Sequence, residues 1–371
     1  MNNTPVYIFI KYFSKYGGVE NICFRFYNFL KNSGYTAKII CGENRTEIND
    51  ENIVETGLIR PGRFLKAWSF NKRAQKYLKF IQAEGITFAF DKVYGCQIYR
   101  TGSASHLDYL LTSIKGFKHP LIKAFIRMCS PVNYYYIFLD RKIFKNKKTQ
   151  TFIAISELVA NEIKRRFSLN SERIAVIHNG VNKKNFNENV KQTFKDVLKK
   201  RLNIDEDKLI IGFSSTNFER KGLDRLITAL MYLPDKYILF IAGGRNSGKY
   251  LKLAKTLNLE KRIFFLGKIE NMPEFYASID VLVHPSYYDT FGNVVAEALS
   301  MNIPVITTKN TGASELVMNG VNGYIIPNYN EKTIAQYITN VINIKGRVLS
   351  QYVMDDFEVF EKYLEVINKI V

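Results

Sequence analysis

Several features that define whole classes of protein are scarce or missing in this chain of 371 residues. Its four cysteines, Cys23, Cys41, Cys96 and Cys129, show no C-x-x-C spacing, so we expect free thiols in a reducing compartment and no structural zinc. The longest apolar runs, such as residues 134–139, are far shorter than the ~18 residues that a membrane-spanning helix needs. No basic leader precedes the first apolar run, so the sequence predicts no secretory signal.

Acidic residues are scarce in one half of the chain. Residues 1–185 carry 30 Lys and Arg against 13 Asp and Glu, a net charge of +17. Residues 186–371 carry 23 against 21, a net charge of +2, and the two halves sum to the +19 of the whole chain. Such an excess indicates an anionic partner for the first half, which could be nucleic acid, an acidic membrane surface or a phosphorylated substrate. The alternative is a solvated, lysine-rich surface.

Apolar runs of four to eight residues alternate along the chain with amphipathic segments of ten to fifteen. This alternation is typical of parallel sheets covered by helices on both faces, so we predict an α/β fold with two doubly wound, Rossmann-like domains. The predicted strands are 6–10, 37–41, 87–90, 152–155, 174–177, 209–213, 237–242, 263–266, 281–284, 305–308 and 324–326. The predicted helices are 20–32, 63–83, 158–167, 223–233, 249–257, 273–278, 292–300, 313–318 and 351–370.

A polar, charged segment, residues 183–207, lacks a strand pattern and marks the join between the domains. We therefore expect a first domain at 1–182 and a second at 205–350. The C-terminal helical segment, 351–371, could return to either one. In doubly wound sheets ligands bind beyond the carboxyl ends of the strands, so the loops after the strands are the places to look for a site.

Two of these loops carry glycine or paired cations. Gly17 and Gly18 follow the first strand, where a ligand could approach the backbone closely, although paired glycines are common in α/β folds. The full G-x-G-x-x-G pattern is absent, which argues against a nicotinamide or flavin enzyme. In the second domain Arg220, Lys221 and Gly222 stand where a strand ends and a helix begins. Two adjacent cations there suit a diphosphate, or they are solvated charges at a loop tip.

A third loop, DTFGNVVAE, carries two carboxylates around the start of a helix. Asp289 and Glu297 are eight residues apart, and the amides of Gly292, Asn293 and Val294 lie at the first helical turn, where they lack partners within the helix. Carboxylates that flank free amides could bind sugar hydroxyls while the amides bind phosphate. The alternative is an ordinary capped helix, but Glu297 lies in the apolar run VVAEAL, and a buried acid needs a partner.

The stretch YILFIAGGRNSGKYLK, residues 237–252, imitates a phosphate-binding P-loop. A P-loop has Ser or Thr after its lysine to hold Mg²⁺, whereas Tyr250 follows Lys249 here. The sequence therefore predicts that this similarity is a coincidence.

Together these motifs resemble the retaining glycosyltransferases of family 4. The resemblance implies the GT-B architecture, in which two Rossmann-like domains face a central cleft. It also implies that the first domain, 1–182, binds the acceptor and the second, 205–350, binds the nucleotide sugar. The segments KYFSKYGG and RKGLDR are similar to segments of enzymes that add a hexose to the heptose of the lipopolysaccharide core. The residues that carry the resemblance are Gly17 and Gly18, the NGV at 179–181, Arg220 to Gly222, Gly243 and Gly244, and Asp289 through Glu297.

The resemblance also implies roles. Arg220 and Lys221 would neutralise the donor diphosphate, Glu297 would hold the ribose, and the Gly17 loop would lie against phosphate or acceptor. The family has two Glu at the positions of Asp289 and Glu297, so the shorter acid at 289 leaves the identity of the sugar open. No metal and no cofactor are expected, because Arg, Lys and helix amides already supply positive charge.

One further candidate lies in the first domain. His106 follows a Gly-Ser-rich turn in YRTGSASHLDYL, a stretch that is similar to the same group of enzymes. It could contact the acceptor or the reacting phosphate, or it could be a structural histidine.

The predicted function is transfer of a hexose from a nucleoside diphosphate sugar, UDP-linked, to a saccharide or glycolipid acceptor such as the lipopolysaccharide core. This implies a cytoplasmic enzyme, peripheral on the inner face of the inner membrane, with no nucleic acid partner. The segment 60–79, which contains Trp68, and the run RKIFKNKK at 141–148 could contact anionic lipid, or each could be a solvated helix face. The alternatives are a nucleotide-sugar epimerase of the same fold and a basic nucleic-acid-binding protein.

Overall fold

The computed structural model describes residues 4–81, 84–102, 104–114, 120–244, 247–344 and 349–370. It divides into two compact units. Unit 1 comprises Met1–Leu111, Leu121–His178 and Phe357–Val371, and unit 2 comprises Thr112–Pro120 and Asn179–Asp356. Parts of three predicted segments lie outside the described residues, namely 82–83 of the helix 63–83, residue 103 near His106, and 245–246 in the P-loop-like stretch.

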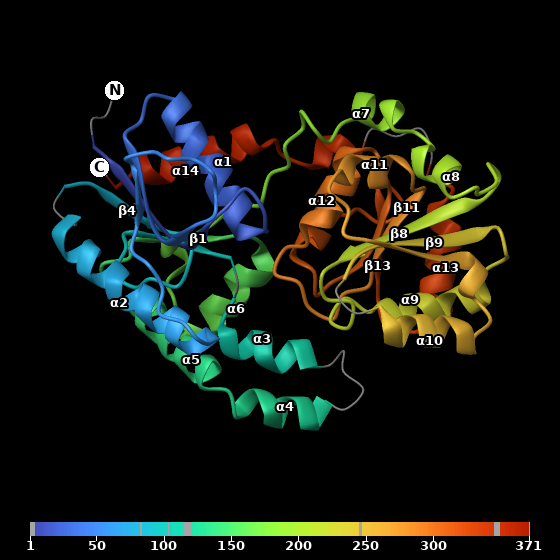
Figure 1. Ribbon diagram of the computed structural model, residues 1–371, viewed down its shortest axis with the longest axis horizontal. Helices are drawn as coiled ribbons and strands as arrows, with labels where there is room; N and C mark the ends of the chain where they lie inside the picture. The colour runs from blue at the N-terminus through green and yellow to red at the C-terminus, as the bar shows by residue number, and fades with distance from the viewer. Residues whose placement is uncertain are drawn as a thin grey trace. The chain divides into compact units, whose positions relative to one another are not determined.

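Unit 1 is built on a seven-stranded parallel sheet among the described residues, in the order β3-β2-β1-β4-β5-β6-β7 (Figure 1). The central strand β1 begins VYIFI, and these side chains are almost fully buried, as expected where helices cover both faces. The sequence predicts five of these strands and misses the short strands β3 and β5. The bounds are β1 (Val6–Phe13), β2 (Ala37–Asn44), β3 (Ile53–Glu55), β4 (Ile86–Ala89), β5 (Ile98–Thr101), β6 (Thr151–Ala154) and β7 (Ile174–Val176).

Helices cover both faces of this sheet. Helices α1 and α14 lie on one face, and α2 and α5 on the other (Figure 1). The sequence misses α3, α4 and α5, which lie between β5 and β6. The helices of unit 1 are α1 (Val19–Asn32), α2 (Arg63–Ile81), α3 (His106–Ser113), α4 (Pro120–Met128), α5 (Pro131–Phe144), α6 (Glu157–Phe167) and α14 (Asp356–Asn368).

The final helix α14 packs on unit 1 although it follows unit 2 in the chain. The ring of Phe26 lies 5.4 Å from that of Phe360 and 5.3 Å from that of Tyr363. The buried Arg100 donates from Nε to the Tyr363 hydroxyl at 2.9 Å. These contacts attach the C-terminal helix to the core around α1.

Unit 2 is built on a six-stranded parallel sheet among the described residues, in the order β10-β9-β8-β11-β12-β13. All six strands occur where the sequence predicts them. Their bounds are β8 (Leu209–Ser215), β9 (Tyr237–Gly243), β10 (Ile263–Gly267), β11 (Val281–His284), β12 (Val305–Thr308) and β13 (Gly323–Ile326). The helices are α7 (Glu188–Thr193), α8 (Val197–Arg201), α9 (Leu223–Ala229), α10 (Gly248–Thr256), α11 (Met272–Ala277), α12 (Asn293–Ser300) and α13 (Glu331–Val341).

Several helix predictions for unit 2 differ from the structure. The segment 313–318 forms only a 3₁₀ helix, Gly312–Leu316, and the helix predicted at 223–233 ends as α9 before a 3₁₀ turn, Leu230–Tyr232. The polar join at 183–207 contains the short helices α7 and α8, and α13 was not predicted.

Each sheet reverses its strand order at one place. In unit 2 the chain builds outward from β8 to β10 and then returns to place β11 beside β8. In unit 1 it builds from β1 to β3 and returns to place β4 beside β1. Loops that follow the two strands at such a switch point diverge to opposite faces and leave room for a ligand at the carboxyl edge.

Candidate functional site

The loop after β8 places Arg220 and Lys221 at the switch point of unit 2. Gly222 has φ +73, and a Cβ there would collide with the Pro285 carbonyl oxygen, so only glycine lets this loop approach the loop after β11. The backbone confirms the approach, because Tyr287 N donates to Arg220 O at 3.0 Å. The predicted cation pair is therefore fixed against the neighbouring strand end.

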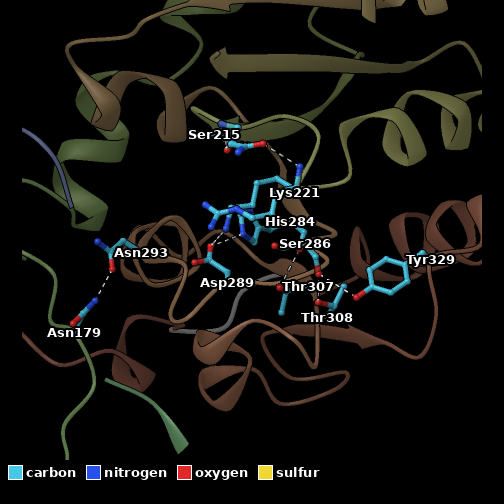
Figure 2. Close-up of polar contacts among 12 residues, drawn as sticks. Asn179, Ser215, Lys221, His284, Ser286, Asp289, Asn293, Thr307, Thr308 and Tyr329 are labelled. Atoms are coloured by element: carbon cyan, nitrogen blue, oxygen red, sulfur yellow. Dashed lines mark hydrogen bonds and ion pairs between the residues drawn. The ribbon is translucent and has the colours of Figure 1, made fainter. Parts of the chain in front are cut away.

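Lys221, Asp289 and His284 form a buried triad (Figure 2). The Lys221 ammonium pairs with Asp289 Oδ2, and His284 Nε2 lies 3.1 Å from the same oxygen. Lys221 is only 5% exposed and His284 1% exposed, whereas the Asp289 side chain keeps 17% of its surface. The side chain of Asp289 is thus the most exposed of the three.

The ionisation of the triad follows from burial and proximity. Burial lowers the pKa of the Lys221 ammonium to about 8, an effect that Asp289 opposes and Arg220 strengthens. Burial alone would raise the pKa of Asp289, but the Lys221 charge and the His284 bond hold that pKa well below its usual range. Burial lowers the pKa of His284, so the imidazole is neutral and Nε2 donates to the carboxylate.

The end of β11, which is His284, and the loop after it are held by hydroxyl groups of β12 (Figure 2). Thr307 Oγ1 donates to His284 O at 3.1 Å, and Thr308 Oγ1 donates to Ser286 O at 2.7 Å. Three buried polar atoms beside it have no hydrogen-bond partner among the described residues, namely His284 Nδ1, Ser286 Oγ and Thr311 Oγ1. Buried unpaired groups are rare, and their concentration beside Asp289 marks this edge as a place where polar contacts remain to be made.

Helix α12 begins directly beyond the triad. Gly292 precedes it with φ +90, and a Cβ there would lie 2.8 Å from Thr311 Cγ2. Asn293 and Val294 are its first two residues, whose amides have no acceptor within the helix. The Asn293 side chain accepts from Asn179 Nδ2 at 2.9 Å, so the NGV segment fixes it.

Glu297 lies one turn further along α12 and has a partner that the sequence analysis missed. Tyr276 of α11, which is fully buried, donates its hydroxyl to Glu297 Oε2 at 2.7 Å. Burial and the Glu297 carboxylate raise the pKa of Tyr276, so this hydroxyl stays protonated and remains a donor. Glu297 is half-buried and oriented by a phenol.

The P-loop-like stretch has a packing role. Gly243 (φ +87) and Gly244 (φ +75) turn against the loop after β8, where Cβ atoms would collide with Ser215 O and the Phe218 ring. Tyr250 is 2% exposed and lies edge-on to Phe218, with ring centroids 5.4 Å apart. A side chain in this apolar core cannot serve a metal-bound phosphate, so the coincidence predicted from sequence is confirmed for the described part of the stretch.

The remaining predicted residues, Gly17, Gly18 and His106, lie in unit 1. Gly17 has φ +103 and is crowded by Glu20, whereas Gly18 has an ordinary φ of −78 and open space around it. His106 is the first residue of α3, and its Nε2 lies 3.0 Å from Asn133 Oδ1.

The structure places the sequence-predicted residues Arg220, Lys221 and Asp289 and the start of α12 along one edge of one sheet. The sequence analysis missed His284 and Tyr276. His284 ends a predicted strand, five residues before Asp289, which was the available signal. The sequence around Tyr276 contains no such signal, because an aromatic residue there is typical of an ordinary core position. Within the described ranges no group of three His, Cys, Asp or Glu side chains is arranged to hold a metal ion.

Two family models match the chain. One, described as Glycosyltransferase Family 4, matches residues 16–185, and the other, described as Glycosyl transferases group 1, matches residues 194–352. The two matches together cover most of both units.

Sequence relatives are also glycosyltransferases by name. An uncharacterized glycosyltransferase of Methanocaldococcus jannaschii is 28% identical over 57% of this chain and 55% of its own length. The lipopolysaccharide glucosyltransferase WaaG of Escherichia coli K12 is 24% identical over 68% of this chain and 66% of its own length. The chain thus spans less than two thirds of the length of these curated relatives.

Solved structures share the fold. The crystal structure of WaaG superposes with a TM-score of 0.78 at 18% identity, covering 98% of this chain and 99% of that one. HepE of Anabaena, solved with UDP and glucose, superposes with a TM-score of 0.71 at 18% identity over 98% and 99% of the two chains. Both sheets and their order thus follow the GT-B type. The chain belongs to the family 4 and group 1 glycosyltransferases, with a family 4 domain followed by a group 1 domain.

Proposed function

We propose that this protein is a retaining glycosyltransferase that moves a hexose from a UDP-linked donor to a saccharide acceptor on the lipopolysaccharide core or another lipid. The observation that carries the proposal is the pair Arg220 and Lys221 beside the start of α12. Two cations and a helix N-terminus at one sheet edge suit a diphosphate. The names of its relatives support the reaction, and the neighbour solved with UDP and glucose supports the donor class.

Positive charge at this edge would stabilise the leaving diphosphate. As the bond between the anomeric carbon and the diphosphate oxygen breaks, negative charge grows on the UDP that leaves. Arg220 offers a planar fork for this charge and Lys221 a point charge, both fixed before the reaction starts. We propose that these groups and the amides of Asn293 and Val294 do this without a metal ion.

The two carboxylates would bind hydroxyl groups. Asp289 Oδ2 accepts hydrogen bonds from Lys221 and His284, so the partly exposed side chain can orient the hexose through Oδ1. Glu297, whose Oε2 accepts from the Tyr276 hydroxyl, would bind the ribose. The acceptor oxygen then bonds to the anomeric carbon, and its proton leaves with the UDP phosphate.

A screen of nucleotide sugars tests this proposal. We expect one UDP-hexose to raise the melting temperature and to be hydrolysed slowly, whereas an oligonucleotide of equal charge does neither. Release of UDP that depends on a saccharide acceptor separates transfer from epimerisation, which releases none. A melting temperature that rises with oligonucleotide and not with any nucleotide sugar would overturn the proposal.

We also propose a membrane surface on unit 1, at a place that differs from the sequence-based candidates. In the run 141–148 the apolar side chains Ile143 and Phe144 are buried, so this run offers charge alone. Helix α4 instead exposes five apolar side chains, and the basic Arg127 lies in its last turn. The five apolar side chains are Leu121 (83% exposed), Ile122 (60%), Phe125 (68%), Ile126 (57%) and Met128 (64%).

A contiguous exposed apolar face on one short helix marks an interaction surface, and the excess of basic residues in residues 1–185 favours an anionic bilayer. A lipid-linked acceptor would explain why the enzyme binds there. No helix in the described ranges is long and apolar enough to cross a membrane.

A further inference from the structure

Two lysine–aspartate pairs lie at the switch point of unit 1, where β4 ends opposite Phe9 and β1 continues to Phe13. Lys11 Nζ of β1 lies 3.4 Å from Asp91 Oδ2, and Asp91 lies two residues past the end of β4. The next residue, Lys92, pairs with Asp140 of α5. The strands β1 and β4 are the neighbours at this switch point, as β8 and β11 are in unit 2, beyond which Arg220 and Asp289 lie.

The ring of Tyr136, from α5, lies between the two pairs. Lys11 Nζ is 6.0 Å and Lys92 Nζ 5.9 Å from its centroid, and the His106 ring meets it at 5.1 Å and 69°. Tyr136 and His106 are half-buried, so the cluster combines an accessible aromatic ring with charged groups. A ring beside hydrogen-bonding groups is the usual chemistry of a site for a small polar ligand.

The two pairs differ in exposure. Lys92 and Asp140 keep 11% and 2% of their side-chain surface, and Asp140 Oδ2 also accepts from His106 N at 2.6 Å. This pair therefore positions α3. Lys11 and Asp91 keep 17% and 27%, so this pair can contact a ligand.

The histidine has a defined tautomer. Burial lowers the pKa of His106, so its ring is neutral. Asn133 Nδ2 donates to Arg127 O at 2.8 Å, which turns its Oδ1 toward His106. His106 Nε2 is then the donor, and Nδ1 is an acceptor for a hydroxyl group.

The cluster is electrically neutral within a strongly basic half of the chain. Each ammonium is matched by a carboxylate and the imidazole is uncharged, although Arg63 lies near enough for its charge to act on His106 and residues 1–185 carry +17. A phosphorylated ligand would leave Asp91 as a repelling charge, whereas hydroxyl groups can donate to Asp91 and accept from Lys11 together.

We propose that Lys11, Asp91, Tyr136 and His106 form an acceptor subsite that binds an uncharged saccharide ring through its hydroxyl groups. This rests on the proposed function. The ring of Tyr136 packs against the C–H groups of the sugar, and the Lys11–Asp91 pair binds vicinal hydroxyls. On this proposal, the net positive charge of residues 1–185 does not serve to bind the acceptor at this subsite.

The test compares methyl glycosides of glucose, galactose and heptose with their matched monophosphates, using saturating UDP-hexose. We expect transfer to at least one neutral glycoside, with kcat/KM at least tenfold above that for its phosphate. Lys11→Met and Asp91→Asn should each raise the KM for this glycoside at least tenfold and leave the donor Kd within twofold. Lys31→Met, which removes a Lys–Asp pair at the opposite edge of the same sheet (Lys31 Nζ to Asp50 Oδ2, 2.7 Å), should leave both constants unchanged.

Preference for a phosphorylated glycoside in the wild type would overturn the inference without any variant. So would unchanged acceptor KM in both variants, or transfer to none of the neutral glycosides by a protein that hydrolyses the donor. A wild type that binds no nucleotide sugar contradicts the proposed function instead, so the two failures are distinct.

Discussion

Replacing Lys221 with methionine keeps the length of the side chain and removes its charge, so it separates the two tasks of this lysine. One task is structural, because Lys221 pairs with the carboxylate of Asp289 in a buried site. The other is functional, because we assign Lys221 to the donor diphosphate. The variant should lose stability and donor affinity together.

The magnitudes follow from the burial of the pair. Removing one partner of a buried ion pair costs about 3–5 kcal/mol, and the low end applies because Asp289 keeps His284 and partial exposure. In a domain of this size that corresponds to a fall in Tm of roughly 6–12 °C. Loss of one charge-assisted bond to phosphate costs about 1.5–3 kcal/mol, which weakens the donor Kd roughly 10- to 150-fold.

The double variant Lys221→Met with Asp289→Asn tests the structural task alone, because Asp289 is also assigned to the donor. Removing the carboxylate as well removes the uncompensated charge, so Tm should recover at least half of its loss while donor binding stays weak. Lys249→Met is the matched control, because Lys249 pairs with Glu219 at 3.1 Å on the surface of the same unit. Calorimetric titration with UDP-hexose and thermal unfolding measure both quantities. A donor Kd that matches that of the control would refute the assignment of Lys221.

The remaining predictions use the same two assays and a vesicle assay. Glu297→Gln and Tyr276→Phe should both weaken the donor Kd, by about tenfold and threefold, because one removes a charged acceptor and the other its orienting donor; equal affinity to wild type in both would count against the ribose contact. Donor affinity should fall as pH rises above about 8, since the Lys221 ammonium is then lost, and Lys221→Arg should remove this fall; a flat wild-type profile to pH 10 contradicts it. Transfer should survive EDTA, and a loss restored by Mg²⁺ would exclude the metal-free proposal. Binding to anionic vesicles should fall with salt, with charge reversal of the basic residues of 141–148 and with Phe125→Asp, but not with reversal of surface lysines of unit 2; if both sets of reversals behave alike, the charge excess is general solvation.

Strands with continuous apolar runs were predictable, whereas strands completed by distant contacts were not. The runs in β8 and β9 fill both faces of a parallel sheet, so composition alone identifies them. Strand β5 reads IYRT, and Arg100 interrupts its pattern. The arginine is buried because it donates to the Tyr363 hydroxyl, 263 residues away, and no local pattern contains that partner.

The same division applies to the candidate site: residues placed by strands could be predicted, and contacts made by packing could not. Arg220, Lys221 and Asp289 follow strands that could be located, and parallel strands bring their carboxyl ends to one edge. The contact of Tyr276 with Glu297 depends on how α11 packs on α12, and the contact of His284 with Asp289 depends on the turn between them. Both are consequences of tertiary packing, which spacing in the sequence does not contain.

The most direct test of the central claim is the product of one reaction. The wild type is incubated with a UDP-hexose and a lipid-linked saccharide, and the saccharide is then analysed by mass spectrometry and NMR while UDP is counted. We predict a gain of one hexose for each UDP released, with the anomeric configuration of the donor kept in the new bond. Conversion of the donor into another UDP-hexose without release of UDP, or a product of inverted configuration, would contradict it.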